Sequence, residues 1–252
     1  MHFQIASDLH IEYKNDDKVD VSKYIIPSAQ VLILAGDIGS FYKYDQLNSF
    51  LEDVSKLFKY VIYIPGNHEY YTPPLHTPLT YKVLTERLNT LAKSCPNVIT
   101  LNRGCVQLGD DICIAGATLW SNIQCPLPKY IIKIHQMTSD QYKELFVTDL
   151  TYITDAIQHC KDNNLKLICV THHPPTRTVF HSTNKKRLKL QSLYVSDLDH
   201  LLDSSSVHTW VCGHVHENFN FITPGGCRLV GNQSGKPKDN ITDYSKEFVI
   251  EV

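Results

Sequence analysis

The sequence contains no long apolar run. Its longest apolar stretches, around Val31–Ala35 and Tyr60–Ile64, are about five residues long, whereas a membrane-spanning helix needs roughly 20. The first residues also lack the basic start and long apolar segment that mark a secretory signal. We therefore expect no transmembrane segment and no membrane partner, and we expect the chain to act in the cytoplasm.

Paired cysteines are absent as well. The eight cysteines occur singly, as Cys95, Cys105, Cys113, Cys125, Cys160, Cys169, Cys212 and Cys227. A thiolate zinc site needs clustered cysteines, and a disulfide framework is typical of shorter secreted chains. Several of these cysteines lie inside apolar runs, so we expect buried free thiols in a reducing compartment.

The chain has no excess of charge of one sign. Its 24 basic and 26 acidic residues give a formal net charge of −2 at pH 7, so bulk nucleic-acid binding, which needs a basic face, is not expected. Internal repeats, low-complexity segments and Gly- or Ser-rich linkers are also missing. The sequence therefore predicts a single domain over residues 1–252 and leaves the oligomeric state open.

Short β-rich apolar runs, in contrast, are frequent. The predicted strands are His2–Ala6, Val31–Ala35, Tyr60–Ile64, Val98–Leu101, Val106–Leu108, Ile112–Ala115, Lys166–Thr171, His208–Cys212, Asn218–Ile222, Arg228–Val230 and Phe248–Val252. Helical spacing is present in Tyr44–Lys59, Leu79–Ser94, Ser139–Lys161 and Ser196–Ser204. This pattern predicts an α/β fold with sheets in the core and helices outside.

Polar motifs follow three strands in the first half of the chain. Asp8-Leu9-His10 follows the first strand, and residues i and i+2 of an extended backbone point to the same side, so this carboxylate and imidazole can meet at one metal ion. Gly36-Asp37 adds a second carboxylate at a sharp turn. Pro65-Gly66-Asn67-His68-Glu69 follows the third strand and is rich in metal-binding and proton-transferring groups.

Two further motifs lie in the second half. The strand ending at Thr171 is followed by His172-His173-Pro174-Pro175, and adjacent side chains of an extended backbone diverge, so we expect only one of these histidines to bind metal. Gly213-His214-Val215-His216 again spaces two histidines by two residues. Each motif alone is more often a solvated polar turn, but five of them at strand ends favour a metal centre.

Taken together, these motifs resemble the signature of the calcineurin-like metallophosphoesterase superfamily: Asp-x-His, Gly-Asp, Gly-Asn-His-Asp/Glu, His and Gly-His-x-His. The segment Val230–Gly235 also resembles the strand-Asn-x-x-Gly ending of its small, bacterial-type members. The resemblance implies a four-layer α-β-β-α sandwich of two packed mixed β-sheets with helices outside. It also implies a binuclear metal centre at the strand ends.

The same resemblance implies a role for each site residue. The first ion would be held by Asp8, His10 and His216, the second by Asn67, His172 and His214, and Asp37 would bridge the two ions. Such a set of nitrogen and oxygen donors without sulfur suits Mn, Fe or Zn, and we favour Mn. Two ions also lower the pKa of a bridging water enough to supply a hydroxide nucleophile.

His68 is the spare histidine of the pattern, and the resemblance gives it the role of contacting the phosphate or protonating the leaving group. Its alternative role is to buttress the turn at Asn67. We expect Glu69 either to orient a metal ligand or to be solvated, and His173 is more often a structural loop residue than a substrate contact.

Some residues near the motifs have both a structural and a functional interpretation. Tyr70, Tyr71 and Trp120 could stack on a substrate base, although aromatic residues more often fill a core. The basic run Asn184–Lys189 could attract a phosphorylated substrate, although a solvated loop is the more common structure. The segments Gly116–Gln136 and Thr176–Val195 are expected to shape the substrate pocket.

The stretch Gly36-Asp37-Ile38-Gly39-Ser40-Phe41 argues against one branch of the superfamily. Protein serine/threonine phosphatases resemble it but extend it as Gly-Asp-x-Val-Asp-Arg-Gly, with an Asp that supports the catalytic His and an Arg that clamps phosphate. Both are missing here. We therefore favour a metal-dependent phosphodiesterase acting on a small or nucleotide-like substrate; the alternatives are a small-molecule phosphomonoesterase, a nuclease and a non-catalytic scaffold.

Overall fold

The computed structural model describes residues Met1–Val252 and contains two β-sheets. The first sheet has the strand order β11-β1-β2-β3-β4, with β1 to β4 parallel and β11 antiparallel to β1. Its strands are β1 (His2–Ala6), β2 (Val31–Ala35), β3 (Tyr60–Ile64), β4 (Val98–Thr100) and β11 (Val249–Glu251).

The second sheet has six strands in the order β5-β6-β7-β8-β10-β9. Strands β6, β7, β8 and β10 are parallel, and the edge strands β5 and β9 are antiparallel to their neighbours. The bounds are β5 (Gly104–Leu108), β6 (Ile112–Ala117), β7 (Lys166–Thr171), β8 (Thr209–Val211), β9 (Phe219–Ile222) and β10 (Arg228–Gly231).

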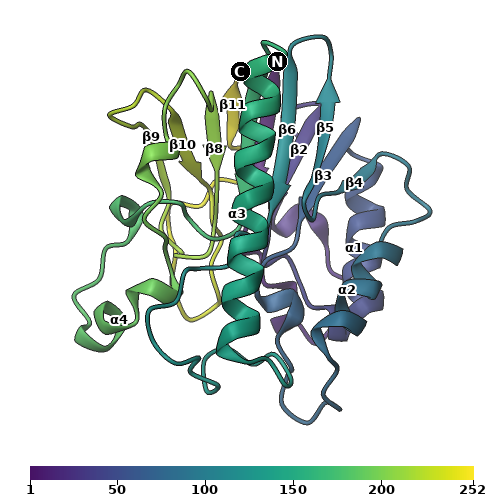
Figure 1. Ribbon diagram of the computed structural model, residues 1–252. Helices are drawn as coiled ribbons and strands as arrows, with labels where there is room; N and C mark the ends of the chain where they lie inside the picture. The colour runs from purple at the N-terminus through teal and green to yellow at the C-terminus, as the bar shows by residue number, and fades with distance from the viewer.

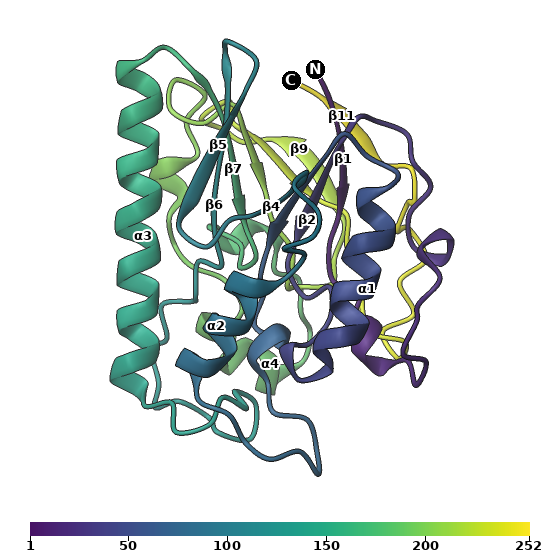
Figure 2. The ribbon, with the colours of Figure 1, turned by 90° about the vertical axis from the view of Figure 1, so that its right-hand side faces the viewer.

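The main helices cover the outer faces of the sheets. They are α1 (Tyr44–Ser55), α2 (Tyr81–Thr90) and α3 (Ser139–Asp162). The short α4 (Lys185–Lys189) lies apart from them, beyond the carboxyl ends of the strands (Figure 1), and none of its residues is buried. Figure 2 shows α3 outside the second sheet and α1 outside the first, with the two sheets between them. The layers therefore run α-β-β-α, as the family resemblance implies. None of the helices combines the length and the hydropathy that crossing a bilayer would require.

Alternation along the strands explains the layers. In β2 all five residues are buried; Val31 and Ile33 pack between the sheets with residues such as Ile114 and Ile168, whereas Leu32 belongs to the cluster that includes the helices. A strand buried on both faces reads as a continuous apolar run. This is why four predicted strands, β1, β2, β3 and β7, match the structure at both ends.

Two expectations outside the strands are wrong. The predicted helix at Ser196–Ser204 is only a single 3₁₀ turn at Asp199–Leu201, because the N–H groups of Leu201 and Leu202 donate to carbonyls three residues back and the N–H of Ser204 donates to the carbonyl of Gly225 instead of continuing the helix. The basic run, expected as a solvated loop, contains the short helix α4. Its start is capped by the side chain of Asn184, which accepts from the N–H groups of Lys186 and Arg187.

All eight cysteines are free, as predicted, and five of them are buried. The other three differ from the expected burial: Cys95 and Cys125 are half-buried, and Cys105 is exposed on the edge strand β5.

The carboxyl ends of the parallel strands of both sheets lie at the same end of the molecule, and the two chain termini lie at the other end (Figure 1). At the carboxyl ends the sheets are joined directly. The N–H of Ser7, just after β1, donates to the carbonyl of Asn232, just after β10, and Ser7 forms a parallel bridge with Gln233. Side chains that follow strands of different sheets are thereby brought within reach of one another.

Candidate metal centre

All seven predicted metal ligands follow the carboxyl ends of parallel strands, and the structure brings them together. The donor atoms of Asp8, His10, Asp37 and His216 lie within 4.8 Å of one another, and so do those of Asp37, His172 and His214. Asp37 belongs to both groups. Asn67 joins the second group, because its Oδ1 lies 3.1 Å from His172 Nε2.

In the first group the donor atoms face a common point. His10 Nε2 lies 3.1 Å from His216 Nε2 and 3.8 Å from Asp37 Oδ2. Asp8 Oδ1 lies 3.2 Å from His216 Nε2. Two imidazole nitrogens directed at each other across such a distance, with two carboxylates beside them, form a set of donors around a cation-sized position.

The second group is arranged around the other oxygen of the shared carboxylate. Asp37 Oδ1 lies 3.2 Å from His172 Nε2. His214 presents its ring beside that of His172, with centroids 5.1 Å apart, and its Nε2 lies 3.3 Å from the carbonyl of Leu193, which leaves Nδ1 as its free donor atom. The two oxygens of Asp37 thus serve two different groups of donors.

Three of the histidines are oriented by an acceptor on the far side of the ring. The Nδ1–H of His10 donates to Glu12 Oε1 at 3.0 Å, that of His172 donates to the carbonyl of Ala35 at 2.9 Å, and that of His216 donates to Asp239. A donated Nδ1–H directs Nε2 into the cluster. This is the usual arrangement of metal-binding histidines, which are held by an outer carboxylate or carbonyl.

The charges of the cluster call for cations. Asp8 and Asp37 are 0% and 1% exposed, yet neither forms an ion pair with Lys or Arg. Buried carboxylates need compensation. Burial opposes charge on the rings, but Asp37 raises the pKa of His172 to about 9, and Asp239 and Asp8 raise the pKa of His216 to about 9. The donor set therefore fits two divalent ions.

The backbone of the site differs from the extended conformation that the sequence argument assumed. Asp8, His10, Asp37, His214 and His216 all have positive φ values, between 48° and 72°. Non-glycine residues rarely adopt this left-handed conformation, in which Asp, Asn and His are enriched. Asp8 and His10 converge as predicted, whereas His214 and His216 belong to different donor groups. The assumed extended backbone is wrong, because left-handed turns aim these side chains.

Glu69 is buried, so the expectation of a solvated glutamate is wrong. Its carboxylate accepts from the N–H groups of Asp37, Ile38 and Gly66 at 3.1, 2.8 and 2.8 Å and from the hydroxyl of Tyr63 at 3.0 Å. These bonds join the loop after β2 to the loop after β3. Glu69 therefore positions the Asp37 loop, the alternative that the sequence left open.

Glycine is required where these loops touch. A β-carbon at Gly66 would overlap Asp37 Oδ1 and the backbone nitrogen of Asp37, and one at Gly36 would overlap the ring of His172. Gly36 also has a φ of +85°. The absence of side chains at these two positions lets the candidate ligands approach one another.

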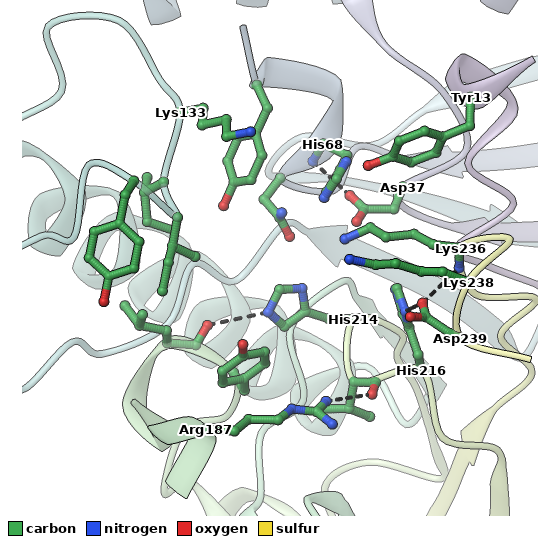
Figure 3. A pocket seen from close by; sticks show the side chains of 18 of the residues that line it. Tyr13, Asp37, His68, Lys133, Arg187, His214, His216, Lys236, Lys238 and Asp239 are labelled. Atoms are coloured by element: carbon green, nitrogen blue, oxygen red, sulfur yellow. Dashed lines mark hydrogen bonds and ion pairs between the residues drawn. The ribbon is translucent and has the colours of Figure 1, made fainter. Parts of the chain in front are cut away.

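His68 lies beside the cluster without belonging to the predicted ligand set. Its N–H donates to Asp37 Oδ1 at 2.8 Å, and its Nδ1 lies 3.2 Å from Glu12 Oε1. Burial lowers the pKa of His68, although Asp37 and Glu12 act in the opposite direction. The ring lines the adjacent cavity together with His214 and His216 (Figure 3).

His173 is buried and belongs to neither of the two donor groups, in line with the expectation that only one of the adjacent histidines binds metal. Its ring packs on that of His214 with centroids 4.0 Å apart. Tyr70 and Trp120 are fully buried, which confirms their interpretation as core residues. Tyr71, in contrast, lines the cavity.

The cavity in front of the cluster has a volume of about 590 Å³, which is within the range of small-molecule sites. Both segments that were expected to shape it contribute, through Tyr130–Lys133 and through Arg187, Leu193 and Tyr194. The Arg187 guanidinium lies over the Tyr194 ring, 4.9 Å from its centroid, and donates to the carbonyl of Val215 at 2.9 Å.

Sequence analysis missed four residues of this site: Glu12, Lys236, Lys238 and Asp239. Glu12 had a usable signal, because it follows His10 by two residues. The other three are on a loop after β10 whose path depends on tertiary contacts, and their spacing in the sequence carries no signal.

Comparisons with known proteins find a matching family model and a similar viral protein. The family model described as calcineurin-like phosphoesterase matches residues 1–218. A protein of Acanthamoeba polyphaga mimivirus, "Uncharacterized protein L509", is 28% identical over 270 residues, which cover 95% of this chain and 94% of that protein.

Solved structures share the fold at low sequence identity. A phosphopantetheinyl hydrolase from Mycobacterium tuberculosis superposes with a TM-score of 0.72 at 15% identity, covering 94% of this chain and 90% of that one. A dimetal phosphatase from Danio rerio gives a TM-score of 0.52 at 11% identity, covering 91% and 86%.

Proposed function

The chain belongs to the calcineurin-like phosphoesterase family, and on this premise we propose that it hydrolyses phosphodiesters of small or nucleotide-like molecules with the help of two divalent metal ions. One observation carries the proposal: seven nitrogen and oxygen donors converge in two groups that share Asp37, beside the spare histidine His68. An abandoned site of a scaffold protein would be expected to have lost some of these donors.

The proposed ligands are those predicted from the sequence. Asp8, His10 and His216 would hold one ion, Asn67, His172 and His214 would hold the other, and Asp37 would serve both. When bound, two such ions neutralise charge on phosphate oxygens and lower the pKa of water, which is the chemistry that phosphoester hydrolysis requires. Manganese is the metal we favour for this donor set.

His68 is the proposed general acid. The Glu12 carboxylate at its Nδ1 stabilises the imidazolium form, and the opposite nitrogen, Nε2, is then the atom that gives a proton to the leaving oxygen. The hydrogen bond from the backbone N–H of His68 to Asp37 Oδ1 holds this residue next to the proposed metal ligands. His68 would thus act on the leaving group, whereas the ions held by the two donor groups would neutralise charge on the phosphoryl group.

The preference for a diester is supported by the loop after β2. Ser40 and Phe41 stand where a protein phosphatase has its supporting Asp and clamping Arg. Ser40 caps a turn by accepting from the N–H of Tyr42, and Phe41 is buried against Tyr70, with ring centroids 5.1 Å apart. Without an arginine clamp at this point the site suits a monoanionic diester.

A phosphomonoesterase is the second candidate. It is favoured by Lys236 and Lys238, which line the cavity and would compensate the additional charge of a monoester.

We further propose that the protein acts in the cytosol, since all eight of its cysteines are free. Fractionation of the source cells would check this location.

The test compares initial rates on bis(4-nitrophenyl) phosphate and 4-nitrophenyl phosphate, with manganese, with a chelator and with the Asp37→Asn variant. We expect metal-dependent turnover with a clear preference for the diester. Asp37→Asn should lose both turnover and bound metal, whereas Asp110→Asn, at an exposed turn after β5, should behave as the native protein. A phosphopantetheinylated carrier domain belongs in the wider panel, since one structural neighbour is titled a phosphopantetheinyl hydrolase.

Faster turnover of the monoester would replace the diesterase proposal with the second candidate. Full activity of Asp37→Asn in the presence of chelator would contradict the metal mechanism itself.

A further inference from the structure

The loop that follows β10, here called the β10 loop (Gln233–Ile241), is fixed to the candidate metal centre. The N–H of Ser234 donates to the carbonyl of Ser7 at 3.1 Å. Within the loop, the N–H of Lys236 donates to Asp239 Oδ2 at 2.9 Å, and the same oxygen accepts from His216 Nδ1. A side chain that orients a proposed metal ligand therefore also sets the conformation of Lys236.

Two lysines of the β10 loop extend into the cavity side by side. Figure 3 shows the Lys236 and Lys238 side chains running alongside each other into the space in front of Asp37, His68 and His214. Neither ammonium group lies within 4.0 Å of a carboxylate. Two neighbouring cations without an anionic partner repel each other, so this arrangement suits the binding of a negatively charged group.

The lysines lie farther toward solvent than the donors that would hold the reacting phosphoryl group. Asp37 is 1% exposed, whereas Lys236 is half-buried and Lys238 is exposed. The cavity volume of about 590 Å³ leaves room for an organic group beyond one phosphoryl group. Tyr130 and Ile132 on its wall provide apolar contacts for such a group.

We propose that the substrate carries a second phosphate group and that Lys236 and Lys238 bind it, outside the phosphoryl group that reacts. This inference rests on the proposed hydrolase function and narrows its substrate class to molecules with two phosphates separated by an organic group. Lysine ammonium groups bind phosphate as point charges, so the two lysines determine specificity through charge.

The test uses two esters that differ by one phosphate: thymidine 5′-(4-nitrophenyl phosphate) and the same ester with a 3′-phosphate. For the native protein with manganese, we expect the 3′-phosphate to lower KM by about 10-fold, a factor typical of one or two charge-assisted contacts. In the double variant Lys236→Gln/Lys238→Gln the ratio of the two KM values should fall to about 1. The Lys56→Gln variant, at the exposed position that follows α1, should keep the native ratio.

A binding experiment separates failure of this inference from failure of the proposed function. Calorimetric titration of the manganese-loaded protein with thymidine 5′-phosphate and thymidine 3′,5′-bisphosphate should give the same approximately 10-fold ratio of Kd, again lost in the double variant. Absence of turnover on both esters would refute the phosphodiesterase, and the Kd ratio would still decide the role of the lysines.

An unchanged ratio of the two KM values in the double variant would overturn the inference. If KM rose by the same factor for both esters, the ratio would also be unchanged, and the lysines would contact the reacting phosphoryl group instead. Lys238→Gln alone, at an exposed position, keeps the test available if the double variant folds poorly. It should lower the native ratio partway.

Discussion

Glu12 links two residues with different proposed roles. One of its oxygens, Oε1, is 3.0 Å from His10 Nδ1 and 3.2 Å from His68 Nδ1. His10 is a proposed metal ligand and His68 the proposed general acid. A single carboxylate therefore orients both imidazoles, so His68 is held in place by the same group that holds the first metal site.

The role of His68 can be separated from metal binding by the choice of leaving group. We expect His68→Gln to keep two metal ions and to lower kcat by about 10²- to 10⁴-fold on a diester with an alkyl leaving group, the range for loss of general acid catalysis. On the 4-nitrophenyl ester the loss should be much smaller, because nitrophenolate leaves without a proton. Metal content by mass spectrometry and rates on both esters provide the measurement.

An equal loss on both esters would instead mean that His68 only buttresses the Asn67 turn. His76→Gln, at an exposed position of the following loop, is the matched control.

The sequence allowed some residues of the candidate site to be predicted and not others. The seven proposed ligands were recognisable because they belong to motifs that follow apolar strands and together resemble one family signature. Asp239 was not, since 23 residues separate it from His216 and only the folded β10 loop brings them together. Sequence spacing reports on neighbours along one backbone segment and not on contacts between loops.

At the scale of elements, the loops after β2 and β3 act as one unit because Glu69 bonds to both. We expect Glu69→Gln to lower the free energy of unfolding by about 1–3 kcal/mol, since the amide NH₂ would face backbone N–H donors and leave some of them unsatisfied. Urea unfolding measures the change. Glu86→Gln, on the exposed side of α2, should differ from the native protein by less than about 0.5 kcal/mol.

If Glu69→Gln unfolded at the native urea concentration, the hydrogen bonds to this carboxylate would contribute nothing to stability, and the loops would be held by other contacts.

Elements were predicted best where burial on both faces dictates the residue pattern, as in β2. They were predicted least well where loop contacts compete with helix bonds. Leu198 and Leu202 have helical spacing and are both buried, but the N–H of Ser204 donates to the carbonyl of Gly225, in the turn between β9 and β10, and the segment forms only a short 3₁₀ turn. Periodicity indicates which side chains are buried, and tertiary hydrogen bonds decide the backbone.

At the scale of the whole molecule, the candidate metal centre is built from loops of both sheets. Asp8 and Asp37 follow strands of the first sheet, and His172 and His216 follow strands of the second. Ions bound there would join the sheets at one end, in addition to the apolar layer between them.

Removal of metal should therefore lower the melting temperature. At a metal concentration about 100 times the Kd, binding adds about 2.7 kcal/mol per site, which corresponds to a shift of roughly 5–10 °C for one site in a chain of this size. We expect a chelator to cause a shift of at least this order in the native protein and almost none in Asp37→Asn. Differential scanning calorimetry measures both, and one transition is expected if the chain is a single domain, as the sequence predicts.

Identical melting temperatures with and without chelator, at verified metal occupancy, would contradict the view that the ions join the sheets.

The left-handed backbone of five site residues also constrains how this protein can change over time. At positions 8, 10, 37, 214 and 216, each positive φ costs about 1–2 kcal/mol for most side chains and less for asparagine, aspartate or glycine. Most substitutions at these positions thus lower stability through the backbone conformation, whatever their effect on metal binding. Lineages that lose catalysis would tend to accumulate asparagine and glycine there, and a degenerate site would keep the shape of its turns long after losing its ligands.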